Sequence, residues 1–96
     1  MNERIKTIAD YYGRENQLQQ LSEECCELSV EAHHHLRNRG TRSELAGEIA
    51  DVLIMLEQII YLEDFTDKEI EELKNEKISR QIRRIKNESE KIKIYK

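Results

Sequence analysis

The chain has 96 residues, no proline and three glycines, and it carries a formal net charge of −4 with 38% of its residues charged. This length suits a single domain over 1–96, and the many helix-favouring Glu, Lys, Leu, Ile and Arg residues predict an all-α fold. With no long uncharged apolar segment and no signal-peptide pattern, we expect a cytoplasmic protein without a membrane partner.

The first predicted helix covers about residues 2–12, and Gly13 is a suitable stop for it. The second covers about 15–39 and carries an apolar stripe that should face the core. The members of this stripe are Leu18, Leu21, Cys25, Leu28, Ala32 and Leu36. Cys25 and Cys26 are neighbours on this helix, where a disulfide between them would distort the peptide, so free thiols and a reducing compartment are expected.

A short turn at Gly40 should make the second and third helices antiparallel neighbours. Thr41 followed by Glu44 forms a capping-box pattern, which starts the third helix. This helix is apolar on most faces as far as Leu62, so it should be buried on most faces. Its main polar stripe contains Glu44, Glu48, Asp51 and Gln58.

Thr66 followed by Glu69 repeats the capping-box pattern and predicts a fourth helix over about 67–87. Residues 88–96 either extend it or form a flexible basic tail. Residues 1–72 carry a net charge of −10 and residues 73–96 a net charge of +6. We read the basic segment as solvated and expect no nucleic-acid polymer as partner.

Two carboxylate pairs with i,i+3 spacing stand out, Glu24 with Glu27 and Glu48 with Asp51. Residues three apart lie on one face of a helix, so two antiparallel helices could gather all four acids. A simple explanation is a solvated acidic face, and it fits the first pair best. The second pair interrupts an apolar helix with no Lys or Arg within reach on it, which favours a site for Mg²⁺, with Mn²⁺ as the alternative ion.

The same residues resemble a known signature. The run 21–28, with its doubled Glu23-Glu24 and Glu27, and the run 47–54, with Glu48 and Asp51, are similar to the paired E-x-x-E and E-x-x-D motifs of the all-α nucleoside triphosphate pyrophosphohydrolases, the MazG-like superfamily. The similarity covers about residues 14–60. It implies a four-helix bundle-like MazG-type fold.

The resemblance further implies that Glu24, Glu27, Glu48 and Asp51 bind Mg²⁺. It implies a nucleoside triphosphate as substrate, and a nucleoside monophosphate and pyrophosphate as products. Either Glu24 or Glu27 would act as general base on the attacking water, and the residues do not choose between them.

Substrate contacts are expected from two regions. Phosphoryl transfer needs cations where charge accumulates, and Lys77 and Arg80 share one face of the fourth helix with Arg84, although ordinary surface charge explains them equally well. The resemblance places base recognition near the start of the second helix, which here means Gln17 and Gln20, with Asn16 and two tyrosines beside them. For Tyr11 and Tyr12, plain packing is the preferred interpretation.

A small domain of this size gains stability from self-association, so a homodimer, or a dimer of dimers forming a homotetramer, is expected. Two other functions stay open. One is a non-catalytic helical regulator that binds a nucleotide or a protein. The other is a di-iron carboxylate bundle, which Glu31 and His34 would suit but which lacks a second Glu-x-x-His pair.

Overall fold

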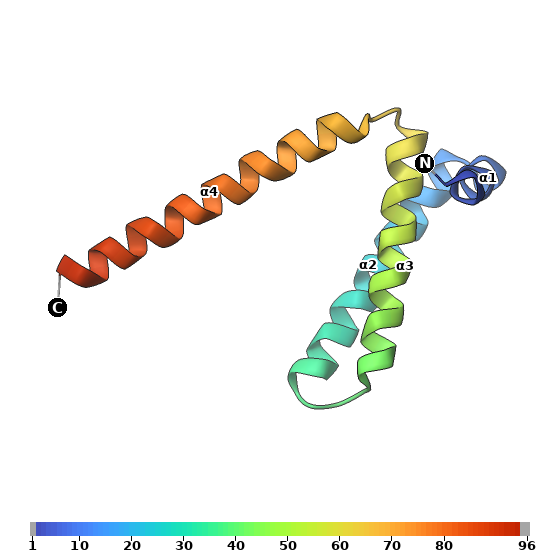
Figure 1. The fold of residues 1–96 in the computed structure, drawn as a ribbon. Coiled ribbons are helices and arrows are strands. Elements are labelled where there is room, and N and C mark those ends of the chain that lie inside the picture. Colours follow the sequence, from blue (N-terminus) through green and yellow to red (C-terminus); the bar gives the residue numbers. More distant parts are fainter. Residues whose placement is uncertain (1, 95–96) are drawn as a thin grey trace. The chain divides into compact units, whose positions relative to one another are not determined.

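A computed structural model describes residues 2–94 of the chain, and side chains as far as residue 91. The described residues form four α-helices and no strand, which confirms the predicted all-α class (Figure 1). The helices are α1 (Glu3–Tyr12), α2 (Arg14–Leu36), α3 (Arg42–Leu62) and α4 (Asp67–Ile94). The chain divides into two units, Met1–Phe65 with α1 to α3 and Thr66–Lys96 with α4, and each is described by itself.

Local signals set the start of the first unit. The side chain of Asn2 accepts a hydrogen bond from the backbone N–H of Arg4 at 2.9 Å, which caps α1. At the other end Gly13 has φ +83° and donates its N–H to the carbonyl of Ala9 at 2.8 Å. Gly13 therefore ends α1 as predicted, and α2 begins at the next residue.

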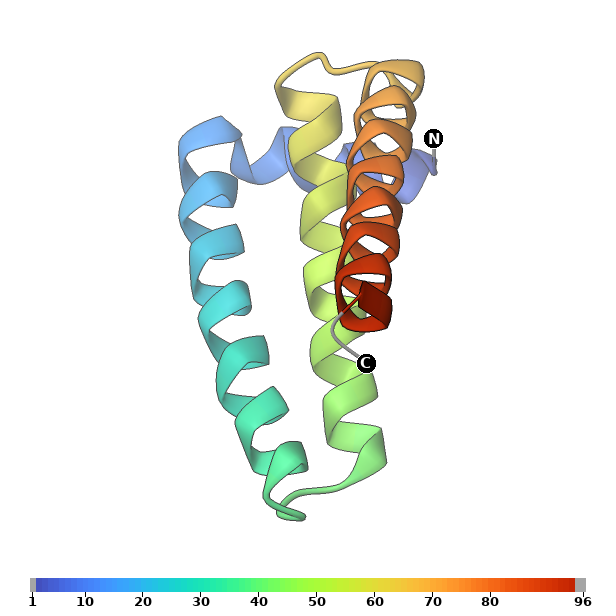
Figure 2. The ribbon, with the colours of Figure 1, turned by 90° about the vertical axis from the view of Figure 1, so that its left-hand side faces the viewer.

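The turn between α2 and α3 differs from the prediction. Helix α2 ends at Leu36, three residues before the expected end at Arg39, because Asn38 already has φ +58° and Gly40 has φ +72°. The N–H of Arg39 reaches back to the carbonyl of His34 at 2.7 Å, which closes the last turn. Thr41 then caps α3 by accepting from the N–H of Glu44 at 3.1 Å, as predicted. Helices α2 and α3 run antiparallel and lie side by side (Figures 1 and 2).

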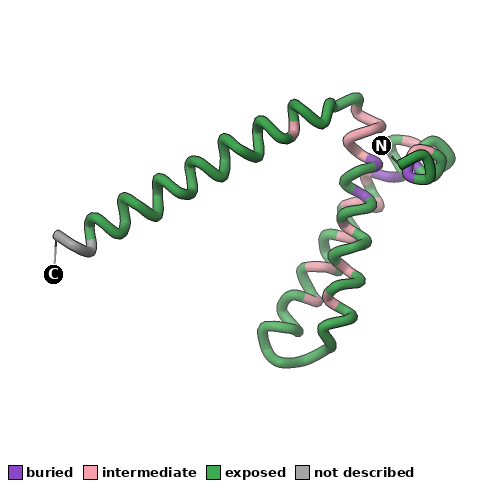
Figure 3. Tube along the Cα trace, in the orientation of Figure 1, coloured by how far each residue is buried: buried purple, intermediate pink, exposed green. Residues whose placement is uncertain are grey.

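The core of the first unit lies where α1 meets the beginning of α2 and the later part of α3 (Figure 3). Its buried apolar side chains are Ile5, Ala9 and Met55, and two amides, Gln17 and Gln58, are buried with them. Outside this core, the hydroxyl of Tyr61 on α3 donates to both carboxylate oxygens of Asp10 on α1, at 2.8 and 3.0 Å.

The predicted core stripe of α2 is only partly correct. Leu18, Leu21 and Leu28 are half-buried, whereas Cys25, Ala32 and Leu36 are exposed. The reason is that, within the first unit, α2 packs mainly against one helix, α3, so the outer edge of its stripe stays exposed there. Leu36 is the last helical residue, beside the turn, and is 78% exposed.

Within the first unit, α3 is not buried on most faces, and the expectation that an assembly buries it stays a prediction. Ile49, Leu53 and Leu56 are 43%, 56% and 41% exposed, because α1 and α2 together cover only one side of this helix.

Tyr11 and Tyr12 are also exposed, which overturns the preferred packing interpretation. Their rings contact one another edge to face with centroids 4.9 Å apart.

The second unit is the single helix α4. Its start is the predicted capping box: Thr66 Oγ1 accepts from the N–H of Glu69, and the Glu69 carboxylate accepts from the N–H of Thr66 at 2.9 Å. The helix continues to Ile94, so residues 88–94 extend it, which is one of the two predicted alternatives, and residues 95 and 96 lie outside the described residues. None of the four described helices has the length and apolar run needed to cross a bilayer.

Candidate metal centre

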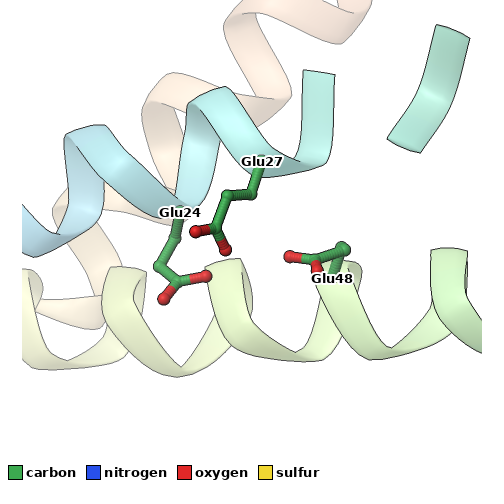
Figure 4. A group of neighbouring side chains, drawn as sticks. All are labelled: Glu24, Glu27 and Glu48. Atoms are coloured by element: carbon green, nitrogen blue, oxygen red, sulfur yellow. The ribbon is translucent and has the colours of Figure 1, made fainter. Parts of the chain in front are cut away.

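Three carboxylates from two helices meet on the side where α2 faces α3. Glu24 and Glu27 point from α2 towards Glu48 on α3, and each offers an oxygen within 4.8 Å of the others' (Figure 4). The short turn at Gly40 makes this possible, because it brings α3 back antiparallel along α2. The structure thus brings together three of the four predicted metal ligands. We call Glu24, Glu27 and Glu48 the acidic group.

Asp51, the fourth predicted ligand, lies outside this close group. It is exposed, one helical turn beyond Glu48 on α3. Its charge nevertheless acts on the group, since it helps to raise the pKa of both Glu48 and Glu27. Asp51 therefore borders the three converging carboxylates without joining them.

The electrostatics of the group favour protonation or a counter-ion. The negative charge of Glu24 is the main cause that raises the pKa of Glu27, followed by burial and by the charge of Glu48. The pKa of Glu48 is raised mainly by burial, and then by the charges of Asp51, Glu24 and Glu31. Like charges and lost solvation both disfavour the ionised form. A bound divalent cation would instead favour the ionised form of these carboxylates.

Hydrogen bonding leaves part of this group unsatisfied. Glu24 Oε2, Glu48 Oε2 and the neighbouring Glu31 Oε1 are buried, and none of them has a hydrogen-bond partner among the described residues. An unpaired buried acceptor costs about 1–3 kcal/mol, and more when it is charged. These hard oxygen atoms are the donor type that Mg²⁺ and Mn²⁺ prefer, so the residues present fit such an ion.

Glu31 is the acid that the sequence analysis did not assign to this site. It lies one turn beyond Glu27 on α2, close enough to help raise the pKa of Glu48. Its Oε2 lies 3.7 Å from Nδ1 of His34, and its Oε1 lies 2.6 Å from where a Cβ on Gly40 would be. The i,i+4 spacing from Glu27 places Glu31 on the same face of α2, and this spacing is the sequence signal that indicates its position.

The two glutamines predicted to contact substrate are engaged within the protein. Gln17 is 4% exposed and donates from Nε2 to Oε1 of Gln58 at 2.7 Å. Gln20 donates from Nε2 to Oε1 of Glu24 at 2.9 Å. Lys77 and Arg80 lie on α4, in the second unit. Substrate contact by these four residues stays a prediction.

Two open pockets lie near the acidic group and the start of α2. The first, of about 310 Å³, is lined by Cys26, Glu27, Val30, Glu31 and Glu48, so it combines three acids with an apolar wall. The second, of about 590 Å³, is lined by Tyr12, Gly13, Arg14, Glu15, Asn16 and Gln19. Arg14 forms an ion pair with Glu63 across this end of the unit.

Comparison with known proteins identified no relative of this chain. No family model, no curated protein and no solved structure matches the chain.

Proposed function

We propose that this chain is a Mg²⁺-dependent nucleoside triphosphate pyrophosphohydrolase, releasing a nucleoside monophosphate and pyrophosphate. The observation that carries the proposal is the convergence of Glu24, Glu27 and Glu48 from two antiparallel helices. The spacing of these acids, with Asp51 three residues after Glu48, is the part of the sequence that resembles the MazG-like signature.

The division of labour follows from the side chains. Glu24, Glu27 and Glu48 would hold the ion, with Asp51 at the border of the group. When bound, Mg²⁺ supplies neutralisation of phosphate charge and a lowered pKa for a coordinated water. Either Glu24 or Glu27 then accepts the proton of the attacking water. Gln20 donates a hydrogen bond to Oε1 of Glu24, and Oε2 of the same carboxylate has no hydrogen-bond partner among the described residues.

Phosphate binding needs cations that the acidic group lacks. Among the described residues, no Lys or Arg forms an ion pair with Glu24, Glu27 or Glu48. Lys77 and Arg80 remain the proposed phosphate contacts, and Gln17 and Gln20 the proposed contacts near the base.

The proposal includes the finer fold and its assembly. Helices α1 to α4 would form a MazG-type bundle that works as a homodimer or a dimer of dimers in the cytoplasm. Ile49, Leu53 and Leu56 support the assembly, because they follow one another at i, i+4 and i+7 on α3 and remain about half exposed. A second copy would remove this apolar surface from water.

The test measures which phosphate bond is cleaved. Purified protein is incubated with a panel of nucleoside triphosphates and Mg²⁺, and released pyrophosphate and orthophosphate are quantified separately. We expect pyrophosphate, and a kcat at least about 100-fold lower for Glu48→Gln. Glu57→Gln, an exposed acid on another side of α3, is the control and should retain activity. Nucleotide binding without turnover across the panel would instead identify a regulator, and orthophosphate release would contradict the proposed bond.

A further inference from the structure

A buried pair of amides links α2 to α3. Gln58 is 1% exposed and Gln17 is 4% exposed, so both side chains are removed from water. Gln17 donates from Nε2 to Oε1 of Gln58 at 2.7 Å, and it accepts from Nδ2 of Asn16 at 3.0 Å. Gln58 in turn donates to Sδ of Met55 at 3.5 Å. The pair joins residues 41 positions apart in the chain.

The position of this pair determines which acids face one another. In two antiparallel helices, seven steps forward from Gln17 on α2 reach Glu24, and seven steps back from Gln58 on α3 reach Asp51. Ten steps in the same directions reach Glu27 and Glu48. The alignment that satisfies the amides is therefore the alignment that gathers the acids.

The acids themselves oppose that alignment. Glu24, Glu27 and Glu48 are like charges with no Lys or Arg paired to them among the described residues, so a displacement along the helix axes would lower their repulsion. The half-buried leucines of α2, Leu18, Leu21 and Leu28, specify the alignment less strictly than a hydrogen bond does, because the hydrophobic effect is not directional. A displacement would separate the amides and leave buried polar groups unpaired, which is costly.

We propose that Gln17 and Gln58 are positioning residues that fix the register of α2 against α3 and so hold the acidic side chains opposite one another. A single buried polar residue is known to set register in this way in coiled coils. The inference rests on the proposed function only for its consequence for metal binding. The register itself is a property of the two helices.

The test replaces both amides by side chains of similar shape without donors, Gln17→Met with Gln58→Met. Removing both partners leaves no orphaned amide between the helices, so the double variant should be more stable than either single variant. Gln19→Met, an exposed neighbour on α2, is the matched control. Register is read directly from the distance between nitroxide labels at Ser22→Cys and Ser43→Cys, in a Cys25→Ser, Cys26→Ser background. Labelled chains are diluted with unlabelled ones to isolate distances within a chain, and no metal is added.

The control should give one narrow distance distribution, and the double Met variant a broadened one or one displaced by about 5 Å, the rise of one helical turn. An unchanged narrow distribution in the double variant would overturn the inference. If that variant does not fold, Gln17→Leu with Leu21→Gln moves the α2 amide by about one turn, and the distance should change accordingly. An unchanged distance there would also overturn the inference.

A separate titration with Mn²⁺ alone, followed by electron paramagnetic resonance, tests the consequence. The double variant should bind Mn²⁺ at least about ten-fold more weakly than the Gln19→Met control. A control protein that binds no Mn²⁺ would remove the proposed metal site, while the label distances would still decide the register.

Discussion

Gln20 and Glu24 are joined by a hydrogen bond of 2.9 Å, from the amide Nε2 to the carboxylate Oε1, one turn apart on α2. This bond occupies one oxygen of Glu24, and the other, Oε2, is buried with no hydrogen-bond partner in the described part of the chain. An amide that orients a metal-binding carboxylate usually contributes about 10–100-fold to metal affinity.

We therefore expect Gln20→Met to weaken Mn²⁺ binding by about ten-fold, measured by calorimetric titration. Gln19→Met should leave the affinity unchanged. The effect should vanish in a Glu24→Gln background, because Gln20 would act only through that carboxylate. An equal loss in that background would show that Gln20 acts by another route.

The raised pKa of Glu48 and Glu27 predicts how stability depends on pH. Their folded-state pKa lies above the ordinary value of 4.5, so the folded protein binds protons more tightly than the unfolded chain does. Without metal, thermal stability should fall as the pH rises from about 4.5 through the raised pKa of these groups. Glu48→Gln should show a smaller fall and a higher melting temperature at neutral pH.

Saturating Mg²⁺ should reverse this trend in the wild type, because the ion competes with protons for the same oxygens. Differential scanning calorimetry from pH 4 to 8, with Mg²⁺ or with a chelator, separates the two cases. Glu57→Gln provides the control and should follow the wild-type curves. A chelated wild type that becomes more stable towards neutral pH would contradict the repulsion described for the acidic group.

The hydrogen bond from Tyr61 to Asp10 should contribute to the stability with which α1 is held against α3. Tyr61→Phe removes the hydroxyl that bridges both Asp10 oxygens, so the urea midpoint should fall modestly and the amides of α1 should exchange faster. The hydrogen bond to Asp10 is the main cause that raises the pKa of Tyr61. Stability from this bond is complete below the ordinary pKa of 10 and is lost as the pH rises through the raised value. Tyr11→Phe, at a side chain 81% exposed, should change nothing.

Substitution of Gly40 should affect both the stability of the turn and the carboxylate of Glu31 beside the acidic group. A Cβ at this position would lie 2.6 Å from Glu31 Oε1, in a backbone with φ +72°. Gly40→Ala should cost roughly 1–3 kcal/mol in the free energy of unfolding and should also weaken Mn²⁺ binding, because the Glu31 carboxylate must move. Gly13→Ala also places a Cβ at a positive φ, +83°, but this Cβ would meet no atom of the described residues within 4 Å, so the substitution should lower stability alone. Equal Mn²⁺ affinities in the Gly40→Ala and Gly13→Ala variants would show that Glu31 does not contribute to metal binding.

Local signals in the sequence were enough for the helix starts. Thr41 and Thr66 each bond to a glutamate three residues ahead, and such contacts lie within one turn of the helix. The end of α2 was missed because Asn38, not only Gly40, adopts a positive φ, and most asparagines do not. All of these signals are local, so closeness in sequence alone does not explain why the starts of α3 and α4 were predicted correctly and the end of α2 was not.

The acidic group was predictable in outline and not in detail. A short turn and two i,i+3 pairs imply that Glu24, Glu27 and Glu48 approach one another. Whether Asp51 joins them depends on the rotation of α3 about its axis, which packing against α1 also influences. The pairing of Gln17 with Gln58 crosses 41 residues, and a periodic pattern shows a face but not the partner of each polar side chain.

The sparse core has a consequence for how the protein behaves on dilution. With only Ile5, Ala9 and Met55 as buried apolar side chains among the described residues of the first unit, the hydrophobic free energy available to that unit alone is small. If copies cover each other's α3 surface, folding and association become a single equilibrium. The melting temperature should then rise with protein concentration, and the proposed pyrophosphohydrolase activity per chain should fall at nanomolar protein even with every ligand saturating.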